Sequence, residues 1–212
     1  MLIDREVDIV VEKLLNLYPD NQTMLDFTTP FELLIATILS AQCTDIRVNQ
    51  ITAVLFKEAN TPSAIIDLGI DRLSEIIKSC GMYNQKSKNI MATSEILVND
   101  FNEEVPKTRE ELMSLPGVGR KTANVVLSNA FGIPAIAVDT HVFRVTNRIG
   151  IVDENNVEKT EDRLMERIKK EDWLHAHHAF IYHGRRVCKA RKPICDGCQI
   201  SDYCLYYKKI KE

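Results

Sequence analysis

Apolar residues recur at steps of three and four along nearly the whole chain, and this helical period restricts the fold more than any other feature. One face of the expected N-terminal helix carries Ile3, Val7, Val10, Leu14 and Leu17. The strict alternation of a half-buried strand does not appear convincingly anywhere. Eight glycines and seven prolines in 212 residues are few turn-formers for an all-β protein. The sequence therefore predicts an all-α protein.

Local start and stop signals place the expected helices. Thr-x-x-Glu capping boxes at Thr29 and Thr108 each mark a helix start. Gly81, Gly132 and Gly150 mark helix ends. Helices are expected at about 30–39, 45–59, 71–79, 85–101, 109–115, 120–131, 141–149, 157–170 and 172–184, with a short helix opening at Thr61-Pro62. No repeat and no low-complexity linker interrupts this series.

The first residues and the hydropathy pattern bear on location. The start, MLIDREVDIVVEKLL, places acidic residues inside an apolar pattern, whereas a signal peptide is basic and then continuously apolar. No window holds 18 uninterrupted apolar residues, so no transmembrane helix is expected. We therefore expect a cytosolic protein with no membrane partner.

Charge is distributed unevenly along the chain. The formal net charge of −3 does not by itself suggest a nucleic-acid-binding protein. Over residues 183–212, however, eight Lys and Arg oppose three Asp and Glu. A basic end on an acidic body can bind phosphate locally, although a solvated tail would give the same count.

The motif LPGVG lies between two expected helices and predicts a tight turn. Pro116 fixes its φ angle, and each glycine allows a backbone conformation closed to other residues. The turn would expose successive backbone N–H groups at a helix start, where the helix dipole also favours an anion. The residues expected to contact DNA are Gly117, Val118, Gly119 and Arg120. This pattern is typical of a helix-hairpin-helix, which holds a DNA backbone without reading sequence; an ordinary Gly-rich turn is the competing interpretation.

Lys121 falls in the first turn of the helix after that motif, where a cation is electrostatically unfavourable. Contact with a DNA phosphate would relieve this cost. Alternatively, a neutral Lys121 could attack C1′ of a sugar, displace the base and form a Schiff base. That role requires a lowered pKa, and the helix dipole, Arg120 and burial would each lower it. Position alone leaves both interpretations open.

Asp139 lies in the segment AVDTH, just before another expected helix, and Asp is a favoured N-cap residue. The same carboxylate could stabilise the positive charge that develops on a sugar as its base leaves, or move protons around the amine. The roles are compatible, since a cap fixes a carboxylate in place. Because a nearby anion would raise the pKa of Lys121, we expect the two groups to face each other across the substrate without forming a tight ion pair.

Four of the six cysteines crowd into the last quarter of the chain with the spacing C-x6-C-x2-C-x5-C. They are Cys188, Cys195, Cys198 and Cys204. In a cytosolic chain this spacing indicates a metal site far more than disulfides. Four thiolates fit either tetrahedral zinc or a [4Fe–4S] cluster, and ligand count does not separate the two. Cys43 and Cys80 stand apart and are expected to be buried small apolar side chains.

Between the first two of these ligands, the loop carries three cations: Lys189, Arg191 and Lys192. Metal ligands at both ends would hold the loop as a rigid basic finger, and its natural partner is phosphate. The metal would then be structural, because it would shape a DNA-contacting loop without entering the chemistry.

Together these features resemble the endonuclease III family of the helix-hairpin-helix glycosylases. The matching segments are LSAQCTD (39–45), GMYNQK (81–86), LPGVGRKTANVVL (115–127), VDTHVFRV (138–145) and the four-cysteine spacing. The resemblance spans nearly the whole chain. It implies an all-α fold of two helical domains flanking a DNA-binding cleft.

The resemblance also divides the chain. One implied domain is a continuous helical bundle over 22–133, with the helix-hairpin-helix at about 108–131. The other joins 1–21 to 134–212 and carries a [4Fe–4S] cluster.

The activity implied by the resemblance is that of a bifunctional DNA glycosylase and abasic-site lyase of base excision repair. Lys121 would form the Schiff base, Asp139 would assist, and oxidised or ring-saturated pyrimidines would be the substrates. β-Elimination would then cut the strand 3′ to the abasic site. The implied partner is double-stranded DNA containing damaged bases or abasic sites, bound by a monomer in the cytoplasm and at the nucleoid.

A base in a duplex must leave the stack before its C1′ can be attacked, and the gap must be filled. By resemblance, Gln42 would be the plug and Met82 the wedge. From the residues alone, Gln42 would be a solvent-facing loop residue and Met82 would pack in the core. The family often has Leu at the wedge position, so Met82 departs from its pattern. His141 is given no chemical role.

Two alternatives compete with this function. A monofunctional glycosylase of the same superfamily would cut only the base bond, using water and a carboxylate, and would not need the Lys121 amine. A non-catalytic DNA-binding module with structural zinc would use Lys121 as a phosphate contact and Asp139 as a helix cap.

Overall fold

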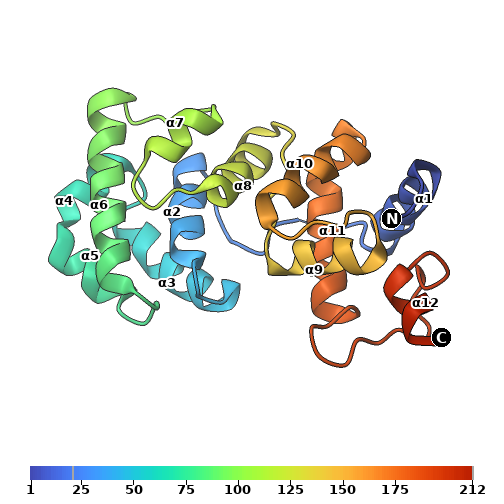
Figure 1. The fold of residues 1–212 in the computed structure, drawn as a ribbon. Helices are drawn as coiled ribbons and strands as arrows, with labels where there is room; N and C mark the ends of the chain where they lie inside the picture. Colours follow the sequence, from blue (N-terminus) through green and yellow to red (C-terminus); the bar gives the residue numbers. More distant parts are fainter. Residues whose placement is uncertain (21, 212) are drawn as a thin grey trace. The chain divides into compact units, whose positions relative to one another are not determined.

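A computed structural model describes residues 1–20 and 22–211, and the regular structure in those residues is entirely helical (Figure 1). The predicted all-α class is confirmed. The chain divides into two compact units, Thr23–Ile133 and Met1–Gln22 together with Pro134–Glu212. Within the described residues, no helix is both long and apolar enough to cross a membrane.

The unit Thr23–Ile133 is a bundle of seven described helices. They are α2 (Pro30–Ser40), α3 (Asp45–Glu58), α4 (Pro62–Leu68), α5 (Ile70–Ile77), α6 (Tyr83–Asp100), α7 (Arg109–Ser114) and α8 (Arg120–Phe131). Helix α2 packs against α3, α6 and α8, and Figure 1 shows it running between α6 and α8. Every side chain of α2 from Phe31 to Leu39 is buried. A helix that is apolar all round belongs in a core, so α2 is the central element of this unit.

The cap at the start of α2 differs in detail from the expected capping box. The Thr29 hydroxyl accepts a hydrogen bond from the Glu32 N–H at 3.1 Å, as predicted. The Glu32 carboxylate, however, accepts from the N–H and hydroxyl of Thr28, at 2.6 and 2.7 Å. The Glu32 side chain therefore extends the cap by one residue instead of closing back on Thr29.

The other unit joins the N-terminal helix to the C-terminal part of the chain. Its helices are α1 (Asp4–Leu17), α9 (Thr140–Ile149), α10 (Val157–Arg167), a 3-10 turn (Lys170–Asp172), α11 (Trp173–Arg186) and α12 (Leu205–Lys211). Helix α11 packs on both α1 and α9. The core between them contains Val7, Val10, Leu14, Val145 and Phe180.

A single arginine ties the N-terminus into this unit. The Arg167 guanidinium donates to the carbonyl oxygens of Leu2 and Ile151 at 2.6 and 2.5 Å, and to the Asp4 carboxylate at 2.9 Å. Leu2 N–H also donates to the Gly150 carbonyl at 2.8 Å. Backbone groups more than 145 positions apart in the chain are thus held together, which makes residues 1–20 an integral part of this unit.

Helix α12 was not anticipated from the sequence, which suggested only a basic tail. It packs against α9. Gly150, at φ +95°, lies so close to Leu205 that an added Cβ would clash with that side chain. The apolar contact that anchors α12 therefore depends on a glycine 55 positions earlier, a relation that no local pattern reveals.

Candidate active site and nucleic-acid interface

The LPGVG motif folds as the expected tight turn between α7 and α8. Gly117 has φ +81°, a conformation that favours glycine, and Gly119 is the N-cap of α8. Val118 N–H donates to the Leu115 carbonyl at 3.1 Å, and the Val118 side chain is buried. The Thr93 hydroxyl donates to the Pro116 carbonyl at 3.0 Å and joins the turn to α6. Val118 therefore anchors the turn, while both glycines present exposed backbone.

The two glycines offer a matched test of this turn. An added Cβ on Gly117 would lie 2.8 Å from Asn89 Nδ2 and would also suffer the strain of a positive φ. We expect Gly117→Ala to lower the free energy of unfolding by about 2 kcal/mol and to weaken DNA binding. On Gly119, with φ −93°, the Cβ meets no atom within 4 Å.

Gly119→Ala serves as the control, with an expected loss below about 1 kcal/mol because it changes only an N-cap. Thermal unfolding and binding to an undamaged duplex measure both effects. Equal losses in the two variants would contradict the assignment of the strained position to Gly117.

The start of α8 has the electrostatic character of an anion site. Its N-cap is a glycine, which has no side chain to accept from the first backbone N–H groups, and its first turn contains no acidic residue. By contrast, Thr or Asn side chains cap α2, α3, α4, α7 and α10. Lys121 lies in this first turn and its side chain is exposed. Amides without a side-chain cap, a helix dipole and a cation together favour a phosphate at this end of the helix.

Asp139 caps α9, as its position before the helix suggested. Its Oδ1 atom accepts from the N–H groups of His141 and Val142, both at 2.8 Å. The preceding residues, 135–138, are all buried, so the chain enters the cap from the core. Because one oxygen makes both cap bonds, Oδ2 takes no part in the cap. The carboxylate is thereby fixed in direction while one oxygen remains to act on a ligand.

His141 adjoins this carboxylate, and its surroundings lower the pKa of its imidazole. Burial lowers its pKa, Arg144 and Arg185 lower it further, and Asp139 opposes them. Its Nδ1 atom lies 3.2 Å from Arg144 Nη2. Gly184 on α11 makes this close approach possible, because an added Cβ would meet His141 Cβ and Arg144 Nη2, both at 3.1 Å. The packing of α9 on α11 thus sets the surroundings of the Asp139 cap.

Gln42 and Met82 lie on adjacent loops of the same unit. Each is a non-glycine residue in the left-handed region, at φ 53° and 57°, and each is exposed. An added Cβ on Gly81 would touch the Gln42 carbonyl oxygen at 3.5 Å, which places the two loops side by side. The default expectation that Met82 packs in the core does not hold, since 52% of its surface is exposed. Strained, exposed backbone of this kind clusters at functional sites.

The four C-terminal cysteines line one cavity. Its other lining residues are Ile149, His183, Val187, Pro193, Ile194, Ile200, Ser201, Tyr206 and Tyr207. Burial raises the pKa of Cys195, Cys198 and Cys204, and the neighbouring cysteines raise it further. Thiolates held this close repel one another unless a cation lies among them, and ligation requires the thiolate form.

The donor set suits an iron–sulfur cluster. Four Cys side chains line one cavity, and a [4Fe–4S] cluster is held by four Cys thiolates. Backbone N–H groups of Tyr206 and Tyr207 hydrogen-bond Cys204. The residues present therefore fit an iron–sulfur cluster.

Arg148, in the last turn of α9, holds the basic loop in place. Its guanidinium donates to the carbonyl oxygens of Lys189 and Ala190 at 2.7 and 3.0 Å, and Nη1 lies 3.7 Å from Cys188 Sγ. It also stacks on the Tyr206 ring, 4.7 Å from the centroid.

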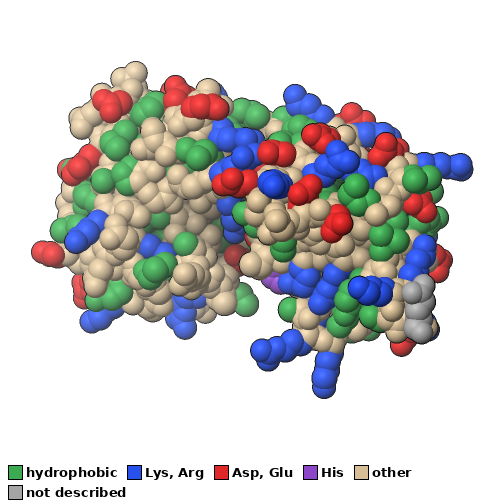
Figure 2. Space-filling view, viewed as in Figure 1, with side chains coloured by type: hydrophobic (Ala, Val, Ile, Leu, Met, Phe, Trp, Pro, Cys, Tyr) green, Lys and Arg blue, Asp and Glu red, His purple; other side chains and the backbone are tan. Residues whose placement is uncertain are grey.

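The three predicted cations of this loop, Lys189, Arg191 and Lys192, are exposed. Basic side chains project from the region of the loop that follows α11 (Figure 2). Anchored backbone and exposed cations make this loop a suitable phosphate contact.

The relatives of the chain agree with these features. Residues 35–170 match the family model of the HhH-GPD superfamily base excision DNA repair protein, and residues 188–204 match the iron-sulfur binding domain of endonuclease III. Endonuclease III of Escherichia coli (strain K12) is 51% identical over 192 residues, which cover 91% of each chain. The chain belongs to the endonuclease III family.

Endonuclease III of Haemophilus influenzae is 51% identical over 193 residues, 91% of this chain and 92% of the relative. A solved structure of a trapped endonuclease III–DNA covalent intermediate matches with a TM-score of 0.94 and 45% identity, covering 100% of both chains.

Membership of the endonuclease III family confirms several predictions. The protein is a base excision repair enzyme, with DNA glycosylase and abasic-site lyase activity that proceeds through a Schiff base. DNA is its partner. The resident cofactor is a [4Fe–4S] cluster, which resolves the choice that cysteine spacing left open between iron–sulfur and zinc.

Two buried or half-buried cations of this endonuclease III family member escaped sequence reasoning. Arg148 gives no signal beyond lying at a helix end, where a cation favours the helix dipole. Lys86 belongs to the GMYNQK segment and is only 4% exposed. A lysine so deeply buried is rare, and a sequence pattern gives no indication of it.

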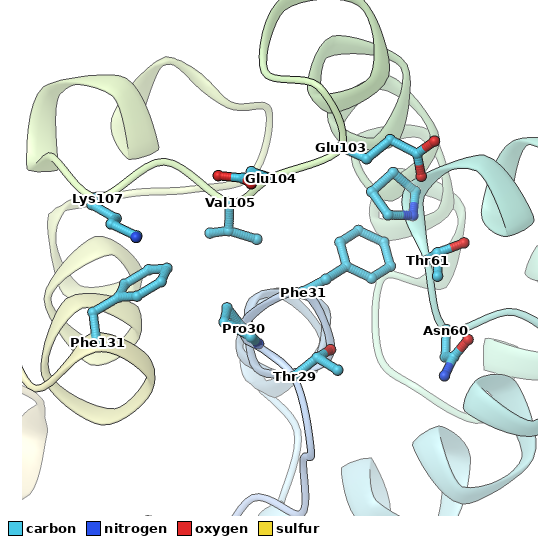
Figure 3. Close-up of a pocket in the computed structure, with 11 residues that line it drawn as sticks. Thr29, Pro30, Phe31, Asn60, Thr61, Glu103, Glu104, Val105, Lys107 and Phe131 are labelled. Atoms are coloured by element: carbon cyan, nitrogen blue, oxygen red, sulfur yellow. The ribbon is translucent and has the colours of Figure 1, made fainter.

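The unit Thr23–Ile133 also contains a hollow of about 430 Å³ away from the predicted site residues (Figure 3). Two helix starts, Thr29-Pro30 and Thr61-Pro62, line it together with Phe31 and Phe131. The Lys107 ammonium lies over the Phe131 ring, 5.5 Å from the centroid. The lining also includes Glu103 and Glu104, but it contains none of the residues predicted for the site.

Proposed function

We propose that this protein removes oxidised or ring-saturated pyrimidines from double-stranded DNA and then cuts the strand 3′ to the abasic site. The observation that carries the proposal is the placement of Lys121. It is an exposed amine in the first turn of α8, immediately after a hairpin whose glycines present backbone to a DNA phosphate. A phosphate held at this helix start places the adjoining sugar within reach of the amine.

The chemistry follows from an amine beside a deoxyribose. Neutral Lys121 forms a bond to C1′ while the C1′–base bond breaks, and the base leaves with the bonding electrons and takes up a proton. Loss of the ring C–O bond gives a protonated Schiff base between Nζ and C1′. Removal of a C2′ proton then expels the 3′ phosphate, and water releases Lys121. No oxidant or reductant is required, so the cluster supplies no electrons to these steps.

A borohydride trap tests this proposal directly. A duplex carrying a ring-saturated pyrimidine should yield a covalent protein–DNA adduct, and without reductant it should yield a strand cut 3′ to the lesion. A monofunctional glycosylase would release the base without an adduct, and a non-catalytic DNA-binding module would do neither. Either of these results with folded, cluster-containing protein would reject the proposal.

Asp139 is proposed to stabilise the positive charge on the sugar and to move protons around the amine. The two cap bonds to Oδ1 fix the carboxylate in place, and Oδ2 remains for this work. The capping role and the charge of Asp139 can be tested separately, because Asn caps a helix about as well as Asp. Asp139→Asn therefore isolates the catalytic contribution.

We expect Asp139→Asn to slow base release by about 100- to 10,000-fold, the range of general acid–base contributions. Its free energy of unfolding should change by less than about 0.5 kcal/mol. Asp139→Ala, the companion variant, should lose roughly 1 kcal/mol as well, because it also removes the cap. Single-turnover base release and thermal unfolding give the two readouts. If the Asn variant excises the base at the wild-type rate, Asp139 acts only as a helix cap.

Recognition of the lesion is proposed to use the strained loops. Gln42 would fill the space that the flipped nucleotide leaves, and Met82 would wedge between neighbouring bases. Exposed side chains on fixed backbone suit this task, because the loop does not have to be ordered on binding. The flexible thioether of Met82 fills an irregular gap as readily as a Leu would.

The cluster, held by Cys188, Cys195, Cys198 and Cys204, would fix the loop of Lys189, Arg191 and Lys192 for contact with phosphate. We further propose that the protein acts as a monomer in the cytoplasm, on the nucleoid. The six cysteines form no disulfide with one another, which fits that compartment.

A further inference from the structure

Lys86, in the first turn of α6, is buried inside the unit Thr23–Ile133 and only 4% exposed. Its Nζ atom donates to the carbonyl oxygens of Leu39 and Ala41, at 2.8 and 2.7 Å. A third donor contacts Cys80 Sγ at 3.0 Å. All three ammonium donors are therefore used, and each acceptor is a carbonyl oxygen or a sulfur.

A buried ammonium without a carboxylate is costly unless its partners favour the charge. Leu39 lies in the last turn of α2 and Ala41 is its C-cap residue, so both carbonyls belong to the negative end of that helix. Carbonyls at a helix end also lack intrahelical partners and need a donor. Lys86 thus supplies both charge and hydrogen bonds where α2 ends.

The three acceptors belong to the two loops that carry Gln42 and Met82. Ala41 directly precedes Gln42, and Cys80 lies two positions before Met82. The Cys80 thiol itself donates to the Leu39 carbonyl at 3.2 Å, so the two loops share one hydrogen-bonded centre at Lys86. The Met82 carbonyl in turn accepts from the Lys86 N–H at 3.1 Å.

Both loops hold a non-glycine residue in the left-handed region, at Gln42 and at Met82. Such backbone persists only where the surroundings over-determine it. Lys86 Nζ donates both to the end of α2 and to the turn before α6, and the Cys80 thiol adds a second link between them.

We propose that Lys86 is a positioning residue for lesion recognition: it locks the two loops together so that Gln42 and Met82 are presented to DNA before binding. The inference rests on the proposed function, in which these side chains enter the duplex. Lys suits this position because a compact ammonium aims three donors in different directions, whereas the planar guanidinium of Arg does not fit the same acceptors.

Lys86→Met tests the proposal, because it keeps the aliphatic stem and removes every donor. Lys57→Met is the matched control, since Lys57 is exposed on α3 of the same unit and carries the same charge. In single-turnover assays on damaged duplex, we expect Lys86→Met to be slower than the control by on the order of 100-fold, the effect of a misplacement of about 1 Å. Fluorescence of a 2-aminopurine beside the lesion should show a matching loss of base flipping.

Two further readouts separate positioning from general damage to the fold. Binding to undamaged duplex should stay within about twofold of the control, because none of the hydrogen bonds of the Lys86 ammonium reaches the hairpin or the basic loop. Amide exchange at Cys43, whose N–H donates to the Ser40 carbonyl at 3.1 Å, should become faster in the DNA-free protein. Excision, flipping and exchange equal to those of the control would overturn the proposal.

A second variant tests the same proposal if Lys86→Met fails to fold. Lys86→Gln retains two donors on a shorter side chain, and we expect an excision rate about tenfold below that of the control, between the control and Lys86→Met. Excision by Lys86→Gln equal to the control would also overturn the proposal. If the parent protein excises no lesion, the proposed function fails instead, and the exchange at Cys43 still decides whether Lys86 holds the loops.

Discussion

Lys121→Gln is expected to abolish the borohydride-trapped adduct and to slow base release by about 10⁶-fold, as loss of a nucleophile does in other enzymes. The amide of Gln has no basic lone pair to attack C1′ and cannot form a Schiff base. Since Lys121 is exposed, its replacement should leave the fold intact. Gel analysis of trapped complexes and single-turnover base release measure the effect.

Lys57→Gln makes the same exchange on an exposed lysine of α3 and should trap at the wild-type level. Binding of the Lys121 variant to abasic duplex should persist, because the hairpin glycines and the basic loop remain. An adduct that survives in Lys121→Gln would assign the nucleophile to another amine and remove the central claim about this site.

Cys198→Ser is expected to remove the cluster and, with it, the order of the basic loop. Its Sγ atom lies 3.7 Å from His183 Nε2. Ligand binding in small structural metal sites contributes about 10 kcal/mol or more, far beyond what the loop contacts could replace. The broad visible absorption of the cluster should disappear.

The same variant should change how DNA binding depends on salt. If Lys189, Arg191 and Lys192 lose their phosphates, the slope of log affinity against log salt should become less negative by about 2 to 3. Cys43→Ser exchanges the same atom outside the cluster and should keep both the absorption and the slope. An unchanged slope in cluster-free protein would show that the loop keeps its contacts without the cluster.

Local chemistry made most of the fold predictable. Thr29, Thr61 and Thr108 begin helices through side-chain caps, and Gly132 and Gly150 end them with positive φ. These signals lie within four residues of the boundary they set, so a sequence displays them directly. Helix α12 was missed because its anchor, Leu205 against Gly150, joins distant parts of the chain.

How much of the site could be predicted from the sequence differs from residue to residue. The cysteine spacing identified a metal site, but only the family relation separated a cluster from zinc. Asp139 was correctly expected to cap a helix. The catalytic roles of Lys121 and Asp139 remain predictions, because each side chain has an ordinary structural role that explains its position.

The structural roles of Lys86 and Arg148 could not be predicted from the sequence pattern. Each donates to backbone carbonyls on other segments. Every residue has a backbone carbonyl, so the sequence does not show which of them accepts the bond. A buried lysine and an exposed lysine look alike in composition. Contacts of side chains with remote backbone therefore have to be seen in three dimensions.

The cap at Asp139 has an evolutionary consequence. Selection for folding accepts Asp, Asn or Ser at this position, because each of these side chains can cap the amides of His141 and Val142. If the charge is needed for repair, selection for repair accepts one. A lineage free of DNA damage could drift to Asn without losing abundance or solubility, and the defect would surface only when oxidised bases returned. Assays of abundance or solubility would thus not detect an inherited loss of repair at this position.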